Sequence, residues 1–155
     1  WGGVSYFPQF LWSVPLPDDA PTTPTSPTSL NDALAGCALD RAYVEGEPHI
    51  KCAISVNQTS GWVRYTVTTP ENFTLVPNTV YLTSMAYIQN DGSDNELKLF
   101  IDGEEVSSTL VAEDSEINSL GLEVLTLGSP GKCSAAGACA SFVGVMYSFT
   151  LSSYV

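Results

Sequence analysis

The chain of 155 residues is long enough for one domain built around a single hydrophobic core. Its five Lys and Arg face 17 Asp and Glu, which gives a formal net charge of −12. Such a negative field disfavours nucleic acid and anionic membrane surfaces as partners, and no apolar run approaches the roughly 20 residues that span a bilayer. The chain begins at Trp1, and we expect it to be a processed or excised segment.

Residues 1–14 form an apolar arm that is rich in aromatic side chains. Left exposed, such a segment would promote aggregation, so we expect it to be buried. It could supply an edge strand of its own domain, or it could add a strand to a neighbouring copy and so build a filament. The side chains that we assign to this contact are Val4, Tyr6, Phe10, Trp12 and Val14.

Residues 15–32 form a tract rich in Pro, Thr and Ser. This composition favours an extended polyproline II conformation and resembles O-glycosylated stalks. At about 3.1 Å per residue, fifteen such residues span roughly 45 Å, far enough either to wrap back over the parent sandwich or to reach a neighbouring subunit. We predict an extended linker here and a β-sandwich domain over residues 33–155. The candidate O-glycosylation sites are Thr22, Thr23, Thr25, Ser26, Thr28 and Ser29.

Four cysteines allow three pairings, and we predict Cys37–Cys52 and Cys133–Cys139 because each pair closes a short local loop. A zinc site is the rival interpretation. The spacings contain no Cys-x2-Cys, however, and His49 is the one histidine of the chain, so the ligand set is sparse.

Two N-glycosylation sequons follow, at Asn57-Gln58-Thr59 and at Asn72-Phe73-Thr74. Together with the cysteines and the Pro/Thr tract, they predict a glycoprotein that is secreted or displayed at the cell surface.

Alternation with a period of two dominates the chain after residue 35, which predicts seven or eight strands and no helix. The segment "TVYLTSMAYIQ" (79–89) is apolar on both faces and is predicted to be a central strand. In "ELKLFIDGEEV" (96–106), Asp102-Gly103 supplies the turn of a tight hairpin. Further strands are predicted in 122–128 and 140–151. Such short strands, with Gly, Pro and Asn between them, indicate an antiparallel sandwich.

Over residues 80–153 this order of strands resembles a concanavalin A-like jelly roll, particularly its laminin G-like and pentraxin-like branch. The resemblance is carried by Leu97–Gly103, by Leu127-Gly128, and by Phe142-Val143-Gly144 in the final strand. It implies a jelly-roll fold but no single function, because this fold hosts lectins, adhesion modules, glycosidases and structural domains.

Candidates for chemistry are few. Asp114 and Glu116 in "VAEDSEI" share a face, as a glycosidase would need, but the segment reads more readily as a polar loop. The oxygen-rich stretch 90–96 could hold calcium through Asp91, Asp94 and Glu96, or it could simply form a solvated hairpin loop.

Two further side chains have an ordinary and a functional interpretation. His49 is better explained as part of a strand edge than as a catalytic base. The Trp62 indole could stack on a sugar ring, although packing under a loop or a glycan is the commoner role.

We therefore predict a non-catalytic structural glycoprotein that uses its arm to assemble with copies of itself, or that contacts other cell-surface or matrix glycoproteins. The alternative is a lectin-like adhesion module that binds glycans, with calcium as a conditional cofactor.

Overall fold

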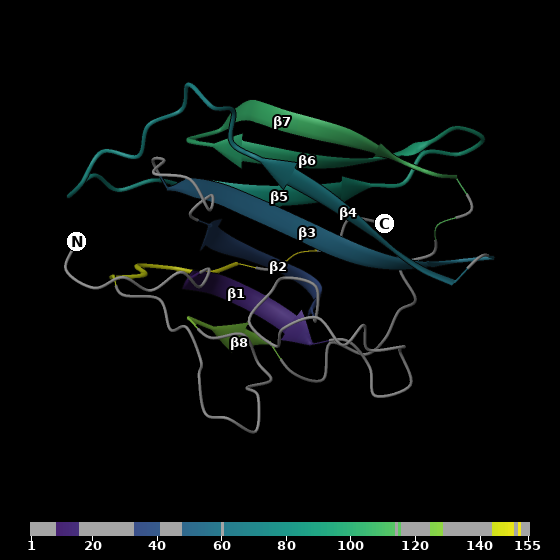
Figure 1. Cartoon of the computed structure of the whole chain (residues 1–155), viewed down its shortest axis with the longest axis horizontal. Coiled ribbons are helices and arrows are strands. Elements are labelled where there is room, and N and C mark those ends of the chain that lie inside the picture. The colour runs from purple at the N-terminus through teal and green to yellow at the C-terminus, as the bar shows by residue number, and fades with distance from the viewer. Residues whose placement is uncertain are drawn as a thin grey trace.

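The computed structural model describes residues 9–15, 33–40, 48–59, 61–113, 115, 125–128, 144–150 and 152. These residues form eight β-strands in two antiparallel sheets, and none of them is helical (Figure 1). The predicted all-β class is therefore confirmed, and two packed antiparallel sheets are what a β-sandwich requires.

The larger sheet has five strands in the order β4-β3-β2-β1-β8. Their bounds are β1 (Gln9–Pro15), β2 (Ala33–Asp40), β3 (His49–Gln58), β4 (Gly61–Thr68) and β8 (Thr126–Leu127). Strands β1 to β4 are consecutive neighbours, whereas β8 comes from far along the chain and pairs with β1.

The smaller sheet has the order β5-β6-β7, with β5 (Thr83–Ile88), β6 (Asn95–Ile101) and β7 (Glu104–Val111). Its middle strand alternates strictly between buried and half-buried residues, as the sequence pattern predicts. The predicted tight hairpin joins β6 to β7. Asp102 and Gly103 both take positive φ angles, 53° and 86°, as a turn matched to the twist of a hairpin requires.

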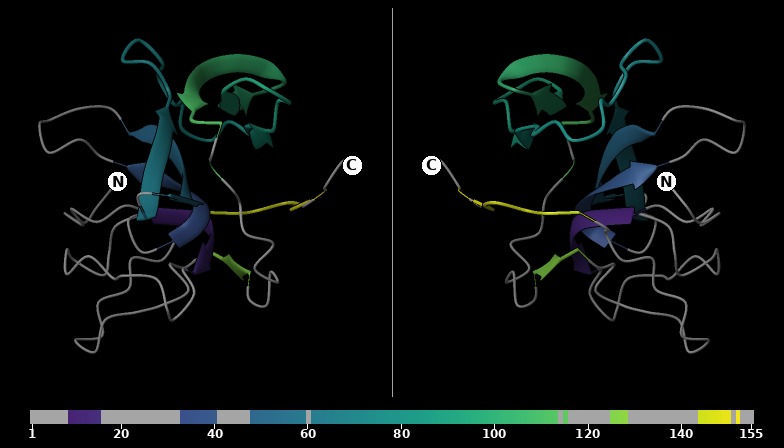
Figure 2. Two further views of the ribbon diagram at one scale, coloured as in Figure 1. Left: turned by 90° about the vertical axis from the view of Figure 1, so that its right-hand side faces the viewer. Right: turned by 90° about the vertical axis from the view of Figure 1, so that its left-hand side faces the viewer.

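The hydrophobic core lies between the sheets. The larger sheet contributes buried residues from β2, β3 and β4, and the smaller sheet contributes residues from β6 and β7. Figure 2 shows the smaller sheet over one part of the larger one, with β1 and β8 lying beyond its edge. The principal core residues are Cys37, Ile50, Cys52, Ile54, Val56, Val67, Leu97, Leu99, Ile101 and Val111.

Two strand predictions need correction. Segment 79–89 does not form a central strand, because β5 has β6 as its one neighbour among the described strands, and Val80 and Leu82 ahead of it are largely exposed. Within the predicted final strand, residues 144–150 are not in a strand. Phe149 packs on Trp12 of β1, whereas Val145 and Tyr147 are exposed. The jelly-roll topology stays a prediction.

Candidate assembly site at the N-terminal strand

The described part of the predicted arm, residues 9–14, lies inside the larger sheet. Strand β1 pairs with β2 on one side and with β8 on the other, and both partners belong to the same chain. Phe10, Trp12 and Val14 are part of β1, whereas Val4 and Tyr6 lie outside the described residues. This aromatic segment has a high propensity for β-strands, and it is paired within a sheet as its sequence predicts.

A register shift in β1 sends its two aromatic side chains to opposite faces of the sheet. Phe10 is opposite Ala38, whereas Trp12 is opposite Cys37, so the bulge falls at Leu11. In a regular strand, residues two apart would share a face. Phe10 instead packs with Ala38 and Ala53 in a small cluster of its own, and only 1% of its surface is exposed.

Polar contacts join β1 to β8. Ser13 and Thr126 are opposite each other in the register, and their hydroxyl oxygens lie 3.2 Å apart. The Thr126 hydroxyl also donates to the Ser13 carbonyl at 3.1 Å. The Gly128 N–H donates to the Leu11 carbonyl at 2.9 Å. These hydrogen bonds hold the short strand β8 against β1, so they would be lost if β1 were absent from the sheet.

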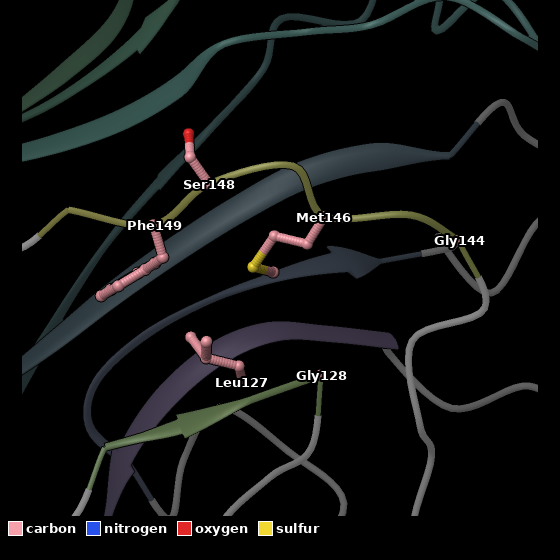
Figure 3. Close-up of a pocket in the computed structure, with 6 residues that line it drawn as sticks. All are labelled: Leu127, Gly128, Gly144, Met146, Ser148 and Phe149. Atoms are coloured by element: carbon pink, nitrogen blue, oxygen red, sulfur yellow. The ribbon is translucent and has the colours of Figure 1, made fainter.

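A groove of about 380 Å³ lies beside this strand pair, between β8 and residues 144–150 (Figure 3). The Met146 and Phe149 side chains point toward the sheet, while that of Ser148 points away. The Phe149 ring packs on Trp12 with 5.8 Å between centroids. The residues lining the groove are Leu127, Gly128, Gly144, Met146, Ser148 and Phe149.

The predicted Cys37–Cys52 disulfide is present. The two cysteines are directly opposite on β2 and β3 with 4.1 Å between their Cα atoms, and both are fully buried. It therefore crosslinks adjacent strands from within the core. Cys133 and Cys139 lie outside the described residues, and so do the O-glycosylation candidates between Thr22 and Ser29.

The two sequons lie in different settings. Asn57 is half-buried near the end of β3, and Trp62 on β4 is its cross-strand partner. Asn72 is exposed in a turn that is closed by a 2.9 Å hydrogen bond from the Phe73 N–H to the Pro70 carbonyl.

The residues proposed for calcium do not come together as a ligand set. Asp91 and Asp94 are exposed in the loop before β6, whereas Glu96 lies on β6 and pairs with Lys98 at 2.8 Å. The hydrogen bonds from Lys98 to Glu96 and to Glu105 raise the pKa of its ammonium group. No group of three His, Cys, Asp or Glu that could hold a metal ion is found among the described residues, and calcium binding stays a prediction.

Of the residues considered for catalysis, the structure describes His49 but not the Asp114 and Glu116 pair. Glu113 is exposed after β7, and Asp114 and Glu116 lie outside the described residues. His49 begins β3, where its Nδ1 lies 3.3 Å from the Thr69 hydroxyl, and that hydroxyl also accepts a hydrogen bond from the Ile50 N–H. These contacts hold the first residues of β3 in place.

A partly buried polar network between the sheets is missed by sequence reasoning. The Gln58 amide donates to the Tyr65 and Ser115 hydroxyls, each at 2.8 Å. The Tyr87 hydroxyl accepts from Asn95 at 3.0 Å and donates to the Ser115 carbonyl at 3.2 Å. Burial raises the pKa of Tyr87, against the opposing effect of its hydrogen bonds. The network ties the two sheets together, and the signal for it is polar residues at inward positions near strand ends.

No family model, curated protein or solved structure matches this chain. The resemblance to concanavalin A-like domains therefore stays a prediction, and the function must be argued from the site itself. No helix able to cross a membrane occurs in the part of the chain that the structure describes.

Proposed function

We propose that the protein is an extracellular structural glycoprotein whose copies assemble into a filament or surface coat by donating β1 to one another. The observation that carries this proposal is the connection between β1 and β2. Pro15 ends β1 opposite Ala33, the first residue of β2. Pro15 and Ala33, the described residues on either side of 16–32, are thus one strand spacing apart, about 4.8 Å.

A connection between paired strands needs far fewer residues than this one has. Antiparallel neighbours are commonly joined by loops of about two to five residues. A Pro-rich segment of this length could extend over roughly 50 Å. The excess length serves no purpose in a hairpin, but it is what a strand needs to reach a neighbouring copy.

The hydrogen bonds at the start of β2 also support the proposal, because they fix one end of the linker. The Ala33 carbonyl accepts hydrogen bonds from Ser55 at 3.0 Å and from Arg64 at 3.1 Å. The linker therefore leaves the domain from a fixed point on the larger sheet. In the proposed exchange, β1, on the other side of the linker, is the element that passes to the next copy.

An identical strand fits the place between β2 and β8 whether it comes from its own chain or from the next one. Exchange between copies keeps the same contacts, which is why swapping of identical elements is a low-cost route to assembly. Without β1, the edges of β2 and β8 would be left open. A head-to-tail series of such donations does not close, and it grows into a fibre.

The setting proposed for this assembly is oxidising. A buried disulfide between β2 and β3 is typical of secreted proteins, and it is compatible with the predicted sequons and the Pro/Thr tract. A structural role requires a stable sheet and a strand that can pair with another copy, and the described residues include both.

A crosslink between β1 and β8 tests the proposal. Ser13 and Thr126 are opposite each other with touching hydroxyls, so S13C/T126C places two thiols where they can form a disulfide. If β1 is donated, this bond joins successive copies. Oxidised material should then run as a ladder on a non-reducing denaturing gel and collapse to one band after reduction.

The single variants S13C and T126C are the matched controls, because either thiol alone can give at most a dimer. The same samples should show filaments or sheets by negative-stain electron microscopy. If the double variant oxidises only to a monomer at every protein concentration, β1 stays in its own chain and the proposal is wrong.

A further inference from the structure

We propose that Asn57 carries an N-linked glycan whose first sugar lies on the indole ring of Trp62. The two residues are directly opposite in the pairing of β3 with β4, and both are half-buried. Side chains opposite each other in an antiparallel pair share a face, with Cβ atoms about 4.5–5.5 Å apart. A sugar attached to Asn57 therefore begins beside the indole.

The end of the β3–β4 hairpin is held so that Asn57 points away from the core. Its neighbour Val56 is fully buried on the inner face, which places Asn57 on the outer one. The next residue, Gln58, turns inward and bonds to Tyr65 and Ser115 at 2.8 Å each. The middle residue of the sequon thus fastens the hairpin while the acceptor asparagine faces outward.

The modification forms one bond and breaks one. The Asn57 amide nitrogen bonds to the anomeric carbon of an oligosaccharide carried on a lipid phosphate, which is the donor in a secretory pathway. The bond from that carbon to the phosphate oxygen breaks, and the lipid phosphate leaves with the electron pair. The amide proton passes to a base of the transferase. No electrons are gained or lost overall.

The indole is suited to hold the attached sugar. The C–H face of a pyranose ring is apolar and packs on an aromatic face, and half-exposed Trp still offers such a face. A neutral sugar covers this surface without adding charge to a chain that already carries −12. The glycan should therefore both shield the indole and stabilise the hairpin.

The second sequon provides the contrast. Asn72 is exposed in its turn, and the aromatic residue beside it is already engaged, because Phe73 packs on the core and lies edge-on to Tyr81 with 6.2 Å between centroids. A glycan at Asn72 should extend into solvent and leave the stability of the fold unchanged.

The experiment uses the full chain secreted from eukaryotic cells that perform N-glycosylation. Peptide mass spectrometry should find Asn57 occupied, and an unmodified Asn57 overturns the proposal. T59A and T74A each remove one sequon at an exposed threonine and so form a matched pair. T59A should lower Tm by about 2–4 °C, whereas T74A should leave it within about 1 °C of the parent.

Two readouts assign this effect to Trp62. In a W62A background, T59A should no longer lower Tm, and an undiminished loss would overturn the stacking. Should W62A fail to fold, quenching of tryptophan fluorescence by acrylamide gives the answer in the parent background. Quenching should rise in T59A but not in T74A, and an equal response in both variants contradicts the proposal.

Discussion

Replacing Phe10 by Ala tests whether β1 is an integral part of the folded sheet. The Phe10 side chain is 1% exposed, so the substitution empties almost its entire volume. Among the described residues, its buried neighbours are Ala38 and Ala53, whose short side chains cannot fill the space. Phe→Ala changes in cores cost about 3–5 kcal/mol, and an unfilled cavity favours the upper half of that range. We expect a loss of about 4 kcal/mol.

Urea unfolding followed by far-ultraviolet circular dichroism measures this loss. With a slope of about 2 kcal/mol per molar, the midpoint should fall by about 2 M. Because small domains have only about 5–15 kcal/mol of stability in total, the variant should be close to unfolding. F10L, which keeps part of the apolar volume, should fall between the parent and F10A.

The control for general effects of apolar truncation is L110A on β7, because Leu110 is 62% exposed and its loss should cost less than about 0.5 kcal/mol. If the free energy of unfolding of F10A lies within about 1 kcal/mol of that of the parent protein, Phe10 is not packed in a core and β1 is not a strand of this sheet. If β1 is donated between copies, the urea midpoint should also rise with protein concentration.

Two more predictions concern the core. The variant C37A/C52A should lose about 3 kcal/mol in the same assay, because the disulfide closes a loop with a sequence separation of 15. A midpoint equal to that of the parent would show that the bond does not restrict the unfolded chain. Y87F should cost about 1–3 kcal/mol, since Asn95 and the Ser115 carbonyl each lose a partner. Burial raises the pKa of Tyr87, so the parent keeps this contribution below about pH 10 and loses it as the pH rises further, whereas Y87F should show a shallower decline. Parallel pH profiles would refute that assignment.

Local patterns predict the strands and the short connections. The alternation of Leu97, Leu99 and Ile101 determines which face of β6 is buried, and Asp102-Gly103 can adopt the positive φ angles that its turn requires. The Cys37–Cys52 bond is predictable because the two residues are close in sequence. Each of these features depends on a few neighbouring residues, which is why the order of amino acids is enough to find it.

The position of β1 within its sheet could not be predicted in the same way. An apolar arm needs burial, but the pattern is silent on which strands will flank it. Its partner β8 lies more than 100 residues away, as the separation of 113 between Ser13 and Thr126 shows. The bulge at Leu11, which lies between Phe10 and Trp12, is defined by the pairing of β1 with β2 and has no local signal in the sequence.

The same limit explains the errors elsewhere. Apolar residues on both faces of 79–89 were compatible with a central strand, and only the pairing of the smaller sheet places β5 at its edge. The alternation in 144–150 was compatible with a strand, but these residues are not in a strand, and Phe149 packs on Trp12 of β1 instead.

Short-range periodicity and turn chemistry are enough to predict the all-β class, the β6–β7 hairpin, the Cys37–Cys52 disulfide and the need to bury the arm. The enclosure of β1 between β2 and β8, the pairing of Asn57 with Trp62 and the polar network between the sheets are known only from the folded chain. The contacts of β1 with β8 and of Gln58 with Ser115 connect residues far apart in the chain, and the pairing of Asn57 with Trp62 depends on the register of β3 with β4, which a local pattern does not specify.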